Sequence, residues 1–391
     1  MTLRFLTAGE SHGPALTAIL EGIPAGLELS AEDINRDLAR RQLGFGSGGR
    51  MKIEHDTARI LSGVMEGKTT GAPIAVQIEN RDHVKWVDRP IPAFTTPRPG
   101  HADLTGVVKY DLPDLRPALE RASARETAAR VAVGAICRKL LLQFNILIGG
   151  YVVAIGGVTA NISAMPLEER IQAALNSDVS CPDPEAAAVM RSQIQEIMRA
   201  GDTLGGLIEI AALGLPPGLG SYVQWDRRLE ARLAASVMSV QAIKGIEIGA
   251  GFENARLPGT QVHDAIQLDG SRLSRPTNRC GGLEGGITTG QPLIIRTAMK
   301  PIATTITPQK TVDLASAENV PTQYERSDFC PVPRAVVILE TVVAFVLMDA
   351  LLEKLGGDSL NEMLPRFTAL RQLYLSDLKL GNTPHIWWPH E

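Results

Sequence analysis

The chain has 391 residues, of which 44% are hydrophobic, and a formal net charge of −4. This length allows either two or three average domains or one large layered unit, and the hydrophobic content excludes a disordered protein. The negative charge argues against a general nucleic-acid binder, because contacts with phosphate groups require a basic surface.

The first element is a predicted strand at residues 3–8, which leads into the stretch Gly9-Glu10-Ser11-His12-Gly13. A second apolar run, at 16–20, follows this stretch. Glycines allow the backbone to come close to a ligand, and a histidine in such a turn can transfer protons near neutral pH. The alternative is a tight hairpin that carries a solvated histidine.

Helix predictions follow from capping residues and hydrophobic periodicity. Ser30 and Asp33 form a capping-box pattern that predicts a helix at 34–42. Pro117 falls in the first turn of a long helix that is predicted to reach about Phe144. The later segments are an insertion or linker at 176–200, a helix at 229–242, an apolar stretch at 335–352 and an irregular tail at 383–391.

The apolar stretch 335–352 is interrupted by Glu340 and Asp349. Carboxylates at membrane depth are costly, so this stretch is predicted to be a buried helix and not a membrane span. The cysteines lack CxxC spacing, which predicts a reduced, cytoplasmic protein with no metal site and no disulfide framework. They are Cys137, Cys181, Cys280 and Cys330.

Internal similarity indicates that one structural unit occurs twice. Both copies follow the order strand, turn, strand, helix, glycine-rich segment, strands and long helix, and they span about residues 1–150 and 200–352. His12 falls opposite Leu204, so the reactive side chain is kept in one copy only, which favours a functional histidine. The paired segments are 9–13 with 201–205, 22–27 with 214–219, and 63–74 with 282–293.

Several stretches are rich in glycine or proline, in arginine or lysine, or in both. Exposed backbone N–H groups and guanidinium groups at such places suit the recognition of phosphate or carboxylate. The stretches are 40–50, 97–103, 121–127, 281–286, 300–305 and 325–328. The plain alternatives are a flexible basic loop, a loop histidine bonded to Asp103, arginines paired with Glu120 and Glu126, and Asp328 paired with Arg326.

These stretches contain no Walker loop, no GxSxG and no metal-ligand spacing. The residues alone therefore point to an enzyme for a small substrate with several negative charges, with a phosphorylated cofactor as a further option. His12 and His101 are the predicted proton carriers.

The same motifs closely resemble those of the chorismate synthase family, and the resemblance runs from about residue 3 to 352. It implies one domain over 1–391 with an α+β fold, a β-α-β sandwich in which helices lie between two antiparallel sheets with an internal pseudo-two-fold repeat. It also implies 1,4-elimination of phosphate from 5-enolpyruvylshikimate 3-phosphate, which gives chorismate. The implied cofactor is reduced FMN with no net redox change, NADPH is an indirect reductant, and the assembly is a homotetramer with no nucleic-acid or membrane partner.

By motif match, the resemblance implies that His12 protonates the departing phosphate, His101 protonates the reduced flavin near N1, and Asp328 assists proton removal through flavin N5. The implied substrate contacts are Ser11, Arg50, Arg98 and Arg125, and the implied NADP contact is Arg41. The implied flavin contacts are Arg121, Ala122, Ser123, Gln241, Ala242, Gly285, Lys300, Pro301, Ile302, Ala303, Thr304 and Arg326. The chain departs from the family at Ser47, where relatives often carry an arginine, and in a shorter segment at 86–96.

Two other functions compete with the phosphate lyase. A flavin oxidoreductase would reduce FMN with NADPH, but the sequence holds no GxGxxG between a strand and a helix for a nicotinamide domain. A binding module for anionic metabolites would have lost catalysis, which the presence of His12, His101 and Asp328 together disfavours.

Overall fold

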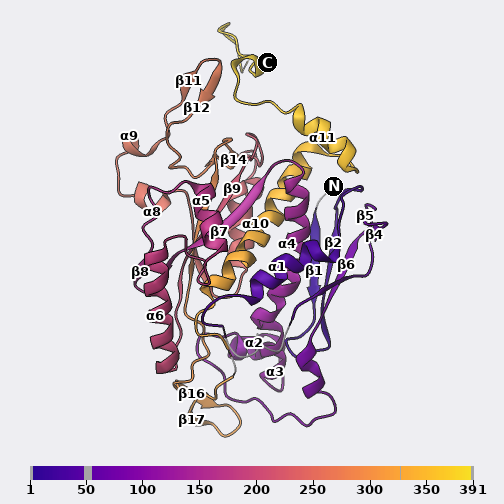
Figure 1. Cartoon of the computed structure of the whole chain (residues 1–391), viewed down its shortest axis with the longest axis vertical. Helices are drawn as coiled ribbons and strands as arrows, with labels where there is room; N and C mark the ends of the chain where they lie inside the picture. The colour runs from indigo at the N-terminus through magenta and orange to yellow at the C-terminus, as the bar shows by residue number, and fades with distance from the viewer. Residues whose placement is uncertain (1–2, 48–54, 326, 389–391) are drawn as a thin grey trace.

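Two antiparallel sheets enclose a layer of helices in the computed structural model of the protein, which describes residues 3–47, 55–325 and 327–388 (Figure 1). This arrangement confirms the predicted α+β sandwich. The first sheet has the order β1-β2-β6-β3, with β1 (Arg4–Ala8), β2 (Ala15–Glu21), β3 (Ala58–Ile60) and β6 (Ile74–Glu79). The second has the order β10-β15-β9-β7-β8, with β7 (Leu147–Ile155), β8 (Val158–Thr159), β9 (Gly206–Leu213), β10 (Ile243–Ile248) and β15 (Leu293–Met299).

The helices between the sheets carry most of the core. They are α1 (Ala31–Gln42), α4 (Thr127–Leu142), α7 (Leu229–Met238) and α10 (Val332–Leu355). At Gly134 of α4, an added Cβ would lie 2.3 Å from Cβ of Thr341, so glycine allows α4 to lie against α10. Strand β6 buries Ile74, Val76 and Ile78 on the face toward these helices, as the alternation of a half-buried strand predicts.

The remaining elements lie around the sandwich. Helix α5 (Leu167–Leu175) covers the outer face of the second sheet, where Ile171 packs with Tyr151 and Val153. The other helices are α2 (Asp103–Tyr110), α3 (Arg116–Ala122), α6 (Pro184–Ala200), α8 (Gly251–Asn254), α9 (Gly259–Val262) and α11 (Leu360–Thr368). Short 3₁₀ turns are η2 (Arg81–Lys85), η3 (Ala124–Glu126), η4 (Trp225–Arg227) and η5 (Leu375–Asp377). The small hairpins are β4 (Val64–Met65) with β5 (Lys68–Thr69), β11 (Gln267–Asp269) with β12 (Arg272–Ser274), β13 (Leu283–Glu284) with β14 (Ile287–Thr288), and β16 (Lys310–Asp313) with β17 (Glu318–Pro321).

The predicted internal repeat is present in the topology. The order β1-β2-β6-β3 of the first sheet corresponds to β7-β9-β15-β10 of the second, and α1 and α4 correspond to α7 and α10. Equivalent threonines make equivalent bonds: Oγ1 of Thr69 donates to Pro24 O at 2.7 Å, and Oγ1 of Thr288 donates to Pro216 O at 2.7 Å. Leu204, opposite His12, packs against the core, so the two turns do differ in chemistry.

Two helix predictions are wrong in their boundaries. The long helix expected from Pro117 to about Phe144 is broken at Ser123, whose backbone is extended and whose Oγ accepts from Arg125 N at 3.3 Å. A serine that bonds to the following backbone favours the start of a new helix over continuation of the old one. The helix expected at 229–242 ends at Met238, because the chain turns through Ala242, with a φ of 67°, into β10.

Residues 176–200 form part of the packed structure. Asp183 accepts from Glu185 N and Ala186 N and so caps α6, whose Met190 and Ile194 are fully buried. This packing favours an insertion over a linker. In the described part of the chain, α10 is the one helix long and apolar enough to cross a membrane by length and composition, and 89% of the relevant window is buried inside the fold.

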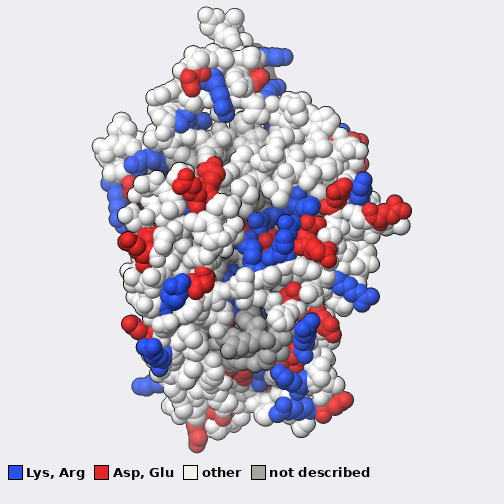
Figure 2. Space-filling model, viewed as in Figure 1, with Lys and Arg blue, Asp and Glu red and all other residues white. Residues whose placement is uncertain are grey.

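Buried charge connects α1, α4 and α10. Glu340 of α10 is 1% exposed, and its carboxylate accepts from Arg40 at 2.6 and 2.9 Å and lies 3.1 Å from Arg138. Arg138 also donates to Asp37 at 2.8 Å. Figure 2 shows basic and acidic side chains side by side over the middle of this face, in the region of α1. The carboxylate of Glu340 is therefore the common partner of two helices.

Replacing Glu340 with glutamine should lower the free energy of unfolding by about 3 kcal/mol, because breaking a buried pair leaves uncompensated charge. This value is the lower end of the usual cost of breaking a buried ion pair, because the side chains of Arg40 and Arg138 are 25% and 21% exposed and water can solvate them. Urea unfolding measures the change. Glu353→Gln, on the same helix but in an exposed pair with Arg227, should cost less than about 1 kcal/mol. Equal losses in the two variants would contradict the prediction.

Candidate active site

The carboxylate of Glu120 holds His12 in the turn after β1. Oε2 of Glu120 accepts from the backbone N of His12 at 2.8 Å, and Nδ1 of the ring lies 2.8 Å from Oε1. The ring of Trp86 lies against the imidazole, with 4.2 Å between the ring centroids. In the described part of the chain, Nε2 of His12 has no hydrogen-bond partner. That nitrogen is the one left for a ligand.

The neighbouring serines and arginines form a connected polar group. Oγ of Ser123 donates to Oγ of Ser11 at 3.2 Å, and Ser11 is 2% exposed. Arg125, also predicted to bind substrate, donates through Nε to Asn80 at 2.8 Å and through Nη1 to Asp56 at 2.6 Å. The break between α3 and α4 thus brings Ser123 and Arg125 to the turn of His12.

Arg41 is bound entirely by protein groups. It is 4% exposed, and it donates to Thr127 Oγ1 at 2.9 Å, to Ala124 O at 3.0 Å and to Asp56 Oδ2 at 3.2 Å. Burial lowers the pKa of Arg41, and the charge of Asp56 opposes that effect. These bonds fix the position of the Arg41 guanidinium, and its contact with NADP stays a prediction.

His101 belongs to a second charged group, built around the fully buried Asp103. Arg98 donates to Asp103 through Nε at 2.8 Å and Nη2 at 3.0 Å, and Nη1 of Arg98 donates to Thr304 Oγ1 at 3.1 Å. Nδ1 of His101 lies 2.6 Å from Asp103 Oδ1 and 3.1 Å from Nη2 of Arg98. The shorter contact with a carboxylate favours a proton on Nδ1, which again leaves Nε2 for a ligand.

The sequence also allowed a plain loop histidine bonded to Asp103, and this contact is present in the structure. The same contact is compatible with a histidine positioned to carry a proton. Burial would raise the pKa of Asp103, but the hydrogen bonds from His101 and Arg98 hold it well below its usual range. Asp103 therefore stays ionised beside His101. Lys300 reaches this loop as well, with Nζ donating to Gly100 O at 3.1 Å.

Asp328 connects the two groups. Its carboxylate accepts from Nη1 of Arg334, and Nε of Arg334 donates to Arg41 O at 2.8 Å. On the other side, Oγ of Ser327 donates to Thr304 O at 3.1 Å. An unbroken series of contacts thus runs from the turn of His12 to His101. The sequence had offered Arg326 as the partner of Asp328, but Arg326 and Arg50 lie outside the described residues.

The predicted flavin contacts fall into three places. Arg121 and Gln241 line a pocket of about 360 Å³ beside β1, together with Thr7, Glu126 and Arg130. Ala242 follows Gln241 directly, and Ala122 and Ser123 follow Arg121. The segment Lys300, Pro301, Ile302, Ala303 and Thr304 leaves β15 and meets the loop of His101 through Lys300 and Thr304.

Gly285 is not brought together with the rest. It lies in the β13–β14 turn. The residue after it, Gly286, accepts a hydrogen bond through its carbonyl oxygen from Leu229 N at the start of α7. Gln241 lies beyond the other end of α7, and a helix of ten residues is about 15 Å long. Within one chain, Gly285 and Gln241 are therefore separated by the length of this helix.

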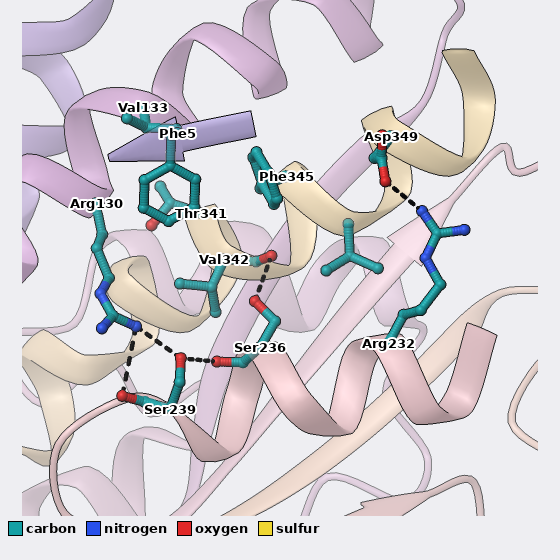
Figure 3. Close-up of a pocket in the computed structure, with 11 residues that line it drawn as sticks. Phe5, Arg130, Val133, Arg232, Ser236, Ser239, Thr341, Val342, Phe345 and Asp349 are labelled. Atoms are coloured by element: carbon teal, nitrogen blue, oxygen red, sulfur yellow. Dashed lines mark hydrogen bonds and ion pairs between the residues drawn. The ribbon is translucent and has the colours of Figure 1, made fainter. Parts of the chain in front are cut away.

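A second pocket of about 360 Å³ adjoins the first and shares Phe5 and Arg130 with it (Figure 3). Phe5, Val342 and Phe345 supply apolar walls. Arg130 donates to Ser239 Oγ at 2.7 Å, and Arg232 donates to Asp349 at 2.6 Å. None of the predicted site residues lines this pocket.

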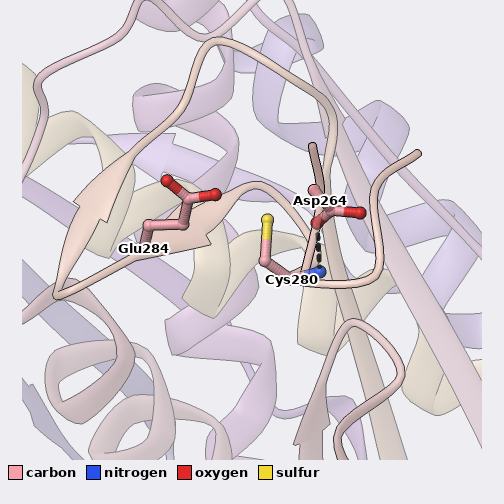
Figure 4. Close-up of side chains that lie close together, drawn as sticks. All are labelled: Asp264, Cys280 and Glu284. Atoms are coloured by element: carbon pink, nitrogen blue, oxygen red, sulfur yellow. Dashed lines mark hydrogen bonds between the residues drawn. The ribbon is translucent and has the colours of Figure 1, made fainter. Parts of the chain in front are cut away.

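Asp264, Cys280 and Glu284 are close enough to be considered as metal ligands (Figure 4). The carboxylate of Asp264, however, accepts from Thr277 Oγ1 at 2.5 Å and from the backbone N atoms of Arg279 and Cys280 at 2.8 and 2.9 Å. Burial raises the pKa of the Cys280 thiol to about 11. These three hydrogen bonds give Asp264 a structural role, because they hold the 277–280 loop in place.

Replacing Asp264 with asparagine should lower stability at neutral pH and reduce its acid sensitivity. Burial would raise the pKa of Asp264, but hydrogen bonds from Thr277, Cys280 and Arg279 lower it to about 2 from its ordinary 3.8. The folded state therefore favours the ionised carboxylate. The contribution of Asp264 to the free energy of unfolding is present above pH 3.8 and is lost as the pH falls toward 2. Urea unfolding at several pH values should show the difference from the native chain narrowing over that window. Asp269→Asn, at an exposed position, is the control, and a difference that stays constant with pH would refute the assignment.

Several site residues were missed by the sequence analysis: Asp56, Asn80, His83, Trp86 and Arg334. Asn80 is 2% exposed, donates to Gly13 O at 2.8 Å and accepts from Nε of Arg125, so it joins the turn of His12 to Arg125. Arg125 and Asn80 are 45 residues apart in the chain. No local pattern marks such a pair, because the fold alone brings the two together.

The fold and the site define an enzyme-like arrangement in which two histidines are held by carboxylates beside buried arginines, a set of groups that suits an anionic small molecule. A sequence model of the chorismate synthase family matches residues 3–352. The chorismate synthases of Trichlorobacter lovleyi and Aquifex aeolicus are 54% and 53% identical to the chain; the alignments cover 92% and 93% of this chain, and 96% of each of those proteins. A crystal structure of a chorismate synthase superposes with a TM-score of 0.78 at 47% identity, covering 94% of this chain and 97% of the other.

The chain belongs to the chorismate synthase family. It is therefore a carbon–oxygen lyase, and the resemblance found in the sequence motifs is confirmed.

Proposed function

We propose that this chain eliminates phosphate from 5-enolpyruvylshikimate 3-phosphate with reduced FMN as cofactor and with His12 and His101 as proton carriers. The observation that supports this most directly is that each histidine has Nδ1 against a carboxylate, at 2.8 Å for His12 and 2.6 Å for His101. A carboxylate on Nδ1 fixes the ring and stabilises its protonated form, so that Nε2 can donate a proton.

The elimination breaks one C–O bond and one C–H bond, and the protein must accommodate both products. His12 would donate a proton to the phosphate oxygen as the C–O bond breaks, while Arg125, Arg98 and Arg50 neutralise the charge of the phosphate and carboxylates. Preorganised donors of this kind lower the barrier because they need no rearrangement as charge develops. Asp328 would assist removal of the proton that the substrate loses, on the cofactor side of the site.

The residues fit a flavin. Oε1 of Gln241 is buried and, in the described part of the chain, has no hydrogen-bond partner, so it can accept from a ring N–H of a ligand. When bound, reduced FMN would supply electron density to the substrate as phosphate leaves, with no net redox change. Arg121, Gln241 and the 300–304 segment would hold it, and His101 would keep a proton near flavin N1.

Further parts of the proposal concern assembly and supply of reductant. We propose a single domain, a homotetramer in the cytoplasm, and NADPH acting indirectly, by keeping FMN reduced. The free cysteines support a reducing compartment, because Cys137, Cys181 and Cys330 are buried thiols.

Anaerobic incubation with photoreduced FMN and the phosphorylated substrate tests the proposal. Release of phosphate and formation of chorismate without NADPH would support the lyase. Release that requires NADPH would show that the chain also reduces flavin. Flavin binding without turnover would favour a binding module and would contradict the proposal.

A further inference from the structure

We infer that Glu120 is the positioning residue of His12: it selects the ring tautomer with the proton on Nδ1 and directs Nε2 toward the substrate. The inference concerns a residue that no sequence motif marked as functional. Its catalytic part rests on the proposed function, whereas its tautomer part can be tested without turnover.

The contact between Glu120 and His12 is bidentate. One carboxylate oxygen accepts from the backbone N of His12 and the other faces Nδ1, both at 2.8 Å. An ionised carboxylate only accepts hydrogen bonds, so the nitrogen that faces it must carry a proton. The neutral ring therefore exposes an unprotonated Nε2, and the charged ring exposes Nε2–H as the acid.

The surroundings keep the carboxylate ionised. The side chains of Glu120 and His12 are 11% and 17% exposed, so water screens the contact little. Burial would raise the pKa of Glu120, but the hydrogen bonds and charge of His12 and the charge of Arg116 lower it. Arg116 precedes Glu120 by one turn of α3, and its guanidinium lies over the ring of Trp86, 5.6 Å from its centroid.

Other groups restrict the ring but leave its tautomer open. Trp86 lies against the imidazole, and Nδ1 of His83 lies 2.8 Å from the carbonyl oxygen of His12. Neither of them contacts a ring nitrogen of His12. Glu120 is therefore the one described side chain that distinguishes Nδ1 from Nε2.

The substitution Glu120→Gln gives a sharp test, because an amide has only one oxygen. If that oxygen continues to accept from the backbone N of His12, the amide NH₂ must face Nδ1. Nδ1 must then accept, and the proton of the neutral ring moves to Nε2. The substitution also removes the charge that stabilises the protonated ring, so the acid form is lost.

The tautomer can be read in protein labelled with ¹⁵N-histidine, by long-range ¹H–¹⁵N correlation without substrate or flavin. His12→Asn assigns the resonances. We expect a proton on Nδ1 in the native chain, the opposite tautomer in Glu120→Gln, and the native tautomer in Glu120→Asp. Glu21→Gln, which removes an exposed carboxylate paired with Arg4, should leave His12 unchanged.

The anaerobic assay gives the second readout. Glu120→Gln should lower kcat by about 10²-fold with little change in KM, the scale of one acid–base contribution, and Glu120→Asp should recover part of the loss. A native tautomer in Glu120→Gln, or a changed tautomer with native kcat, would overturn the inference. If the native chain itself releases no phosphate, the proposed function fails, and the spectra alone decide the assignment of Glu120. If Glu120→Gln does not fold, Glu120→Ala takes its place, and a native tautomer in that variant would overturn the inference.

Discussion

Replacing His12 with alanine should leave flavin binding close to native and reduce phosphate release by about 10²- to 10⁴-fold, the range for loss of a general acid. The ring contacts Glu120 and Trp86, whereas the predicted flavin residues Arg121 and Gln241 line a pocket that does not include His12. The loss should therefore appear in kcat, because the missing proton is needed only as the C–O bond breaks. Anaerobic kinetics and flavin titration measure the two effects separately.

His385→Ala is the matched control for this variant. His385 lies in the exposed C-terminal segment, next to Ile386, and should be neutral for turnover and for flavin affinity. Native turnover in His12→Ala would remove His12 from the mechanism. Loss of flavin binding in that variant would instead show that the turn at 9–13 supports the cofactor.

The repeat and the two histidines could be predicted from the sequence because each signal is local. Glycines of 22–27 and 214–219 recur at the same spacing, and the bonds of Thr69 and Thr288 show why: both copies close the same turn in the same way. A histidine next to glycine or proline is equally visible in the sequence. The catalytic and binding roles given to these residues remain predictions.

What could not be predicted depends on contacts between distant parts of the chain. Nothing near His12 in the sequence indicates Glu120, which is 108 residues away. The continuous helix expected through Ser123 also hides the helix break that brings Ser123 to Ser11. Arg334 lies just before the apolar stretch predicted at 335–352 and was given no role, yet it holds Asp328. Helical periodicity describes the apolar face of α10 and carries no information on a single buried guanidinium.

The other large effect is expected at Asp56, whose carboxylate lies between two guanidinium groups. Oδ1 accepts from Arg125 at 2.6 Å and Oδ2 from Arg41 at 3.2 Å, and the side chains of these arginines are 3% and 5% exposed. Asp56→Asn keeps the shape but removes the charge, so two buried like charges remain beside each other. The free energy of unfolding should fall by about 5 kcal/mol, at the upper end of what breaking a buried ion pair costs.

The same variant should also weaken substrate binding, because Arg125 would be free to leave its predicted position, and KM should rise more than kcat falls. Urea unfolding and anaerobic kinetics measure the two effects. Asp178→Asn, in an exposed pair with Arg191, should cost less than about 1 kcal/mol and leave KM unchanged. A stable Asp56→Asn variant with native KM would show that Arg41 and Arg125 tolerate each other without a carboxylate. The buried anion would then not be what holds the arginines in place for the substrate.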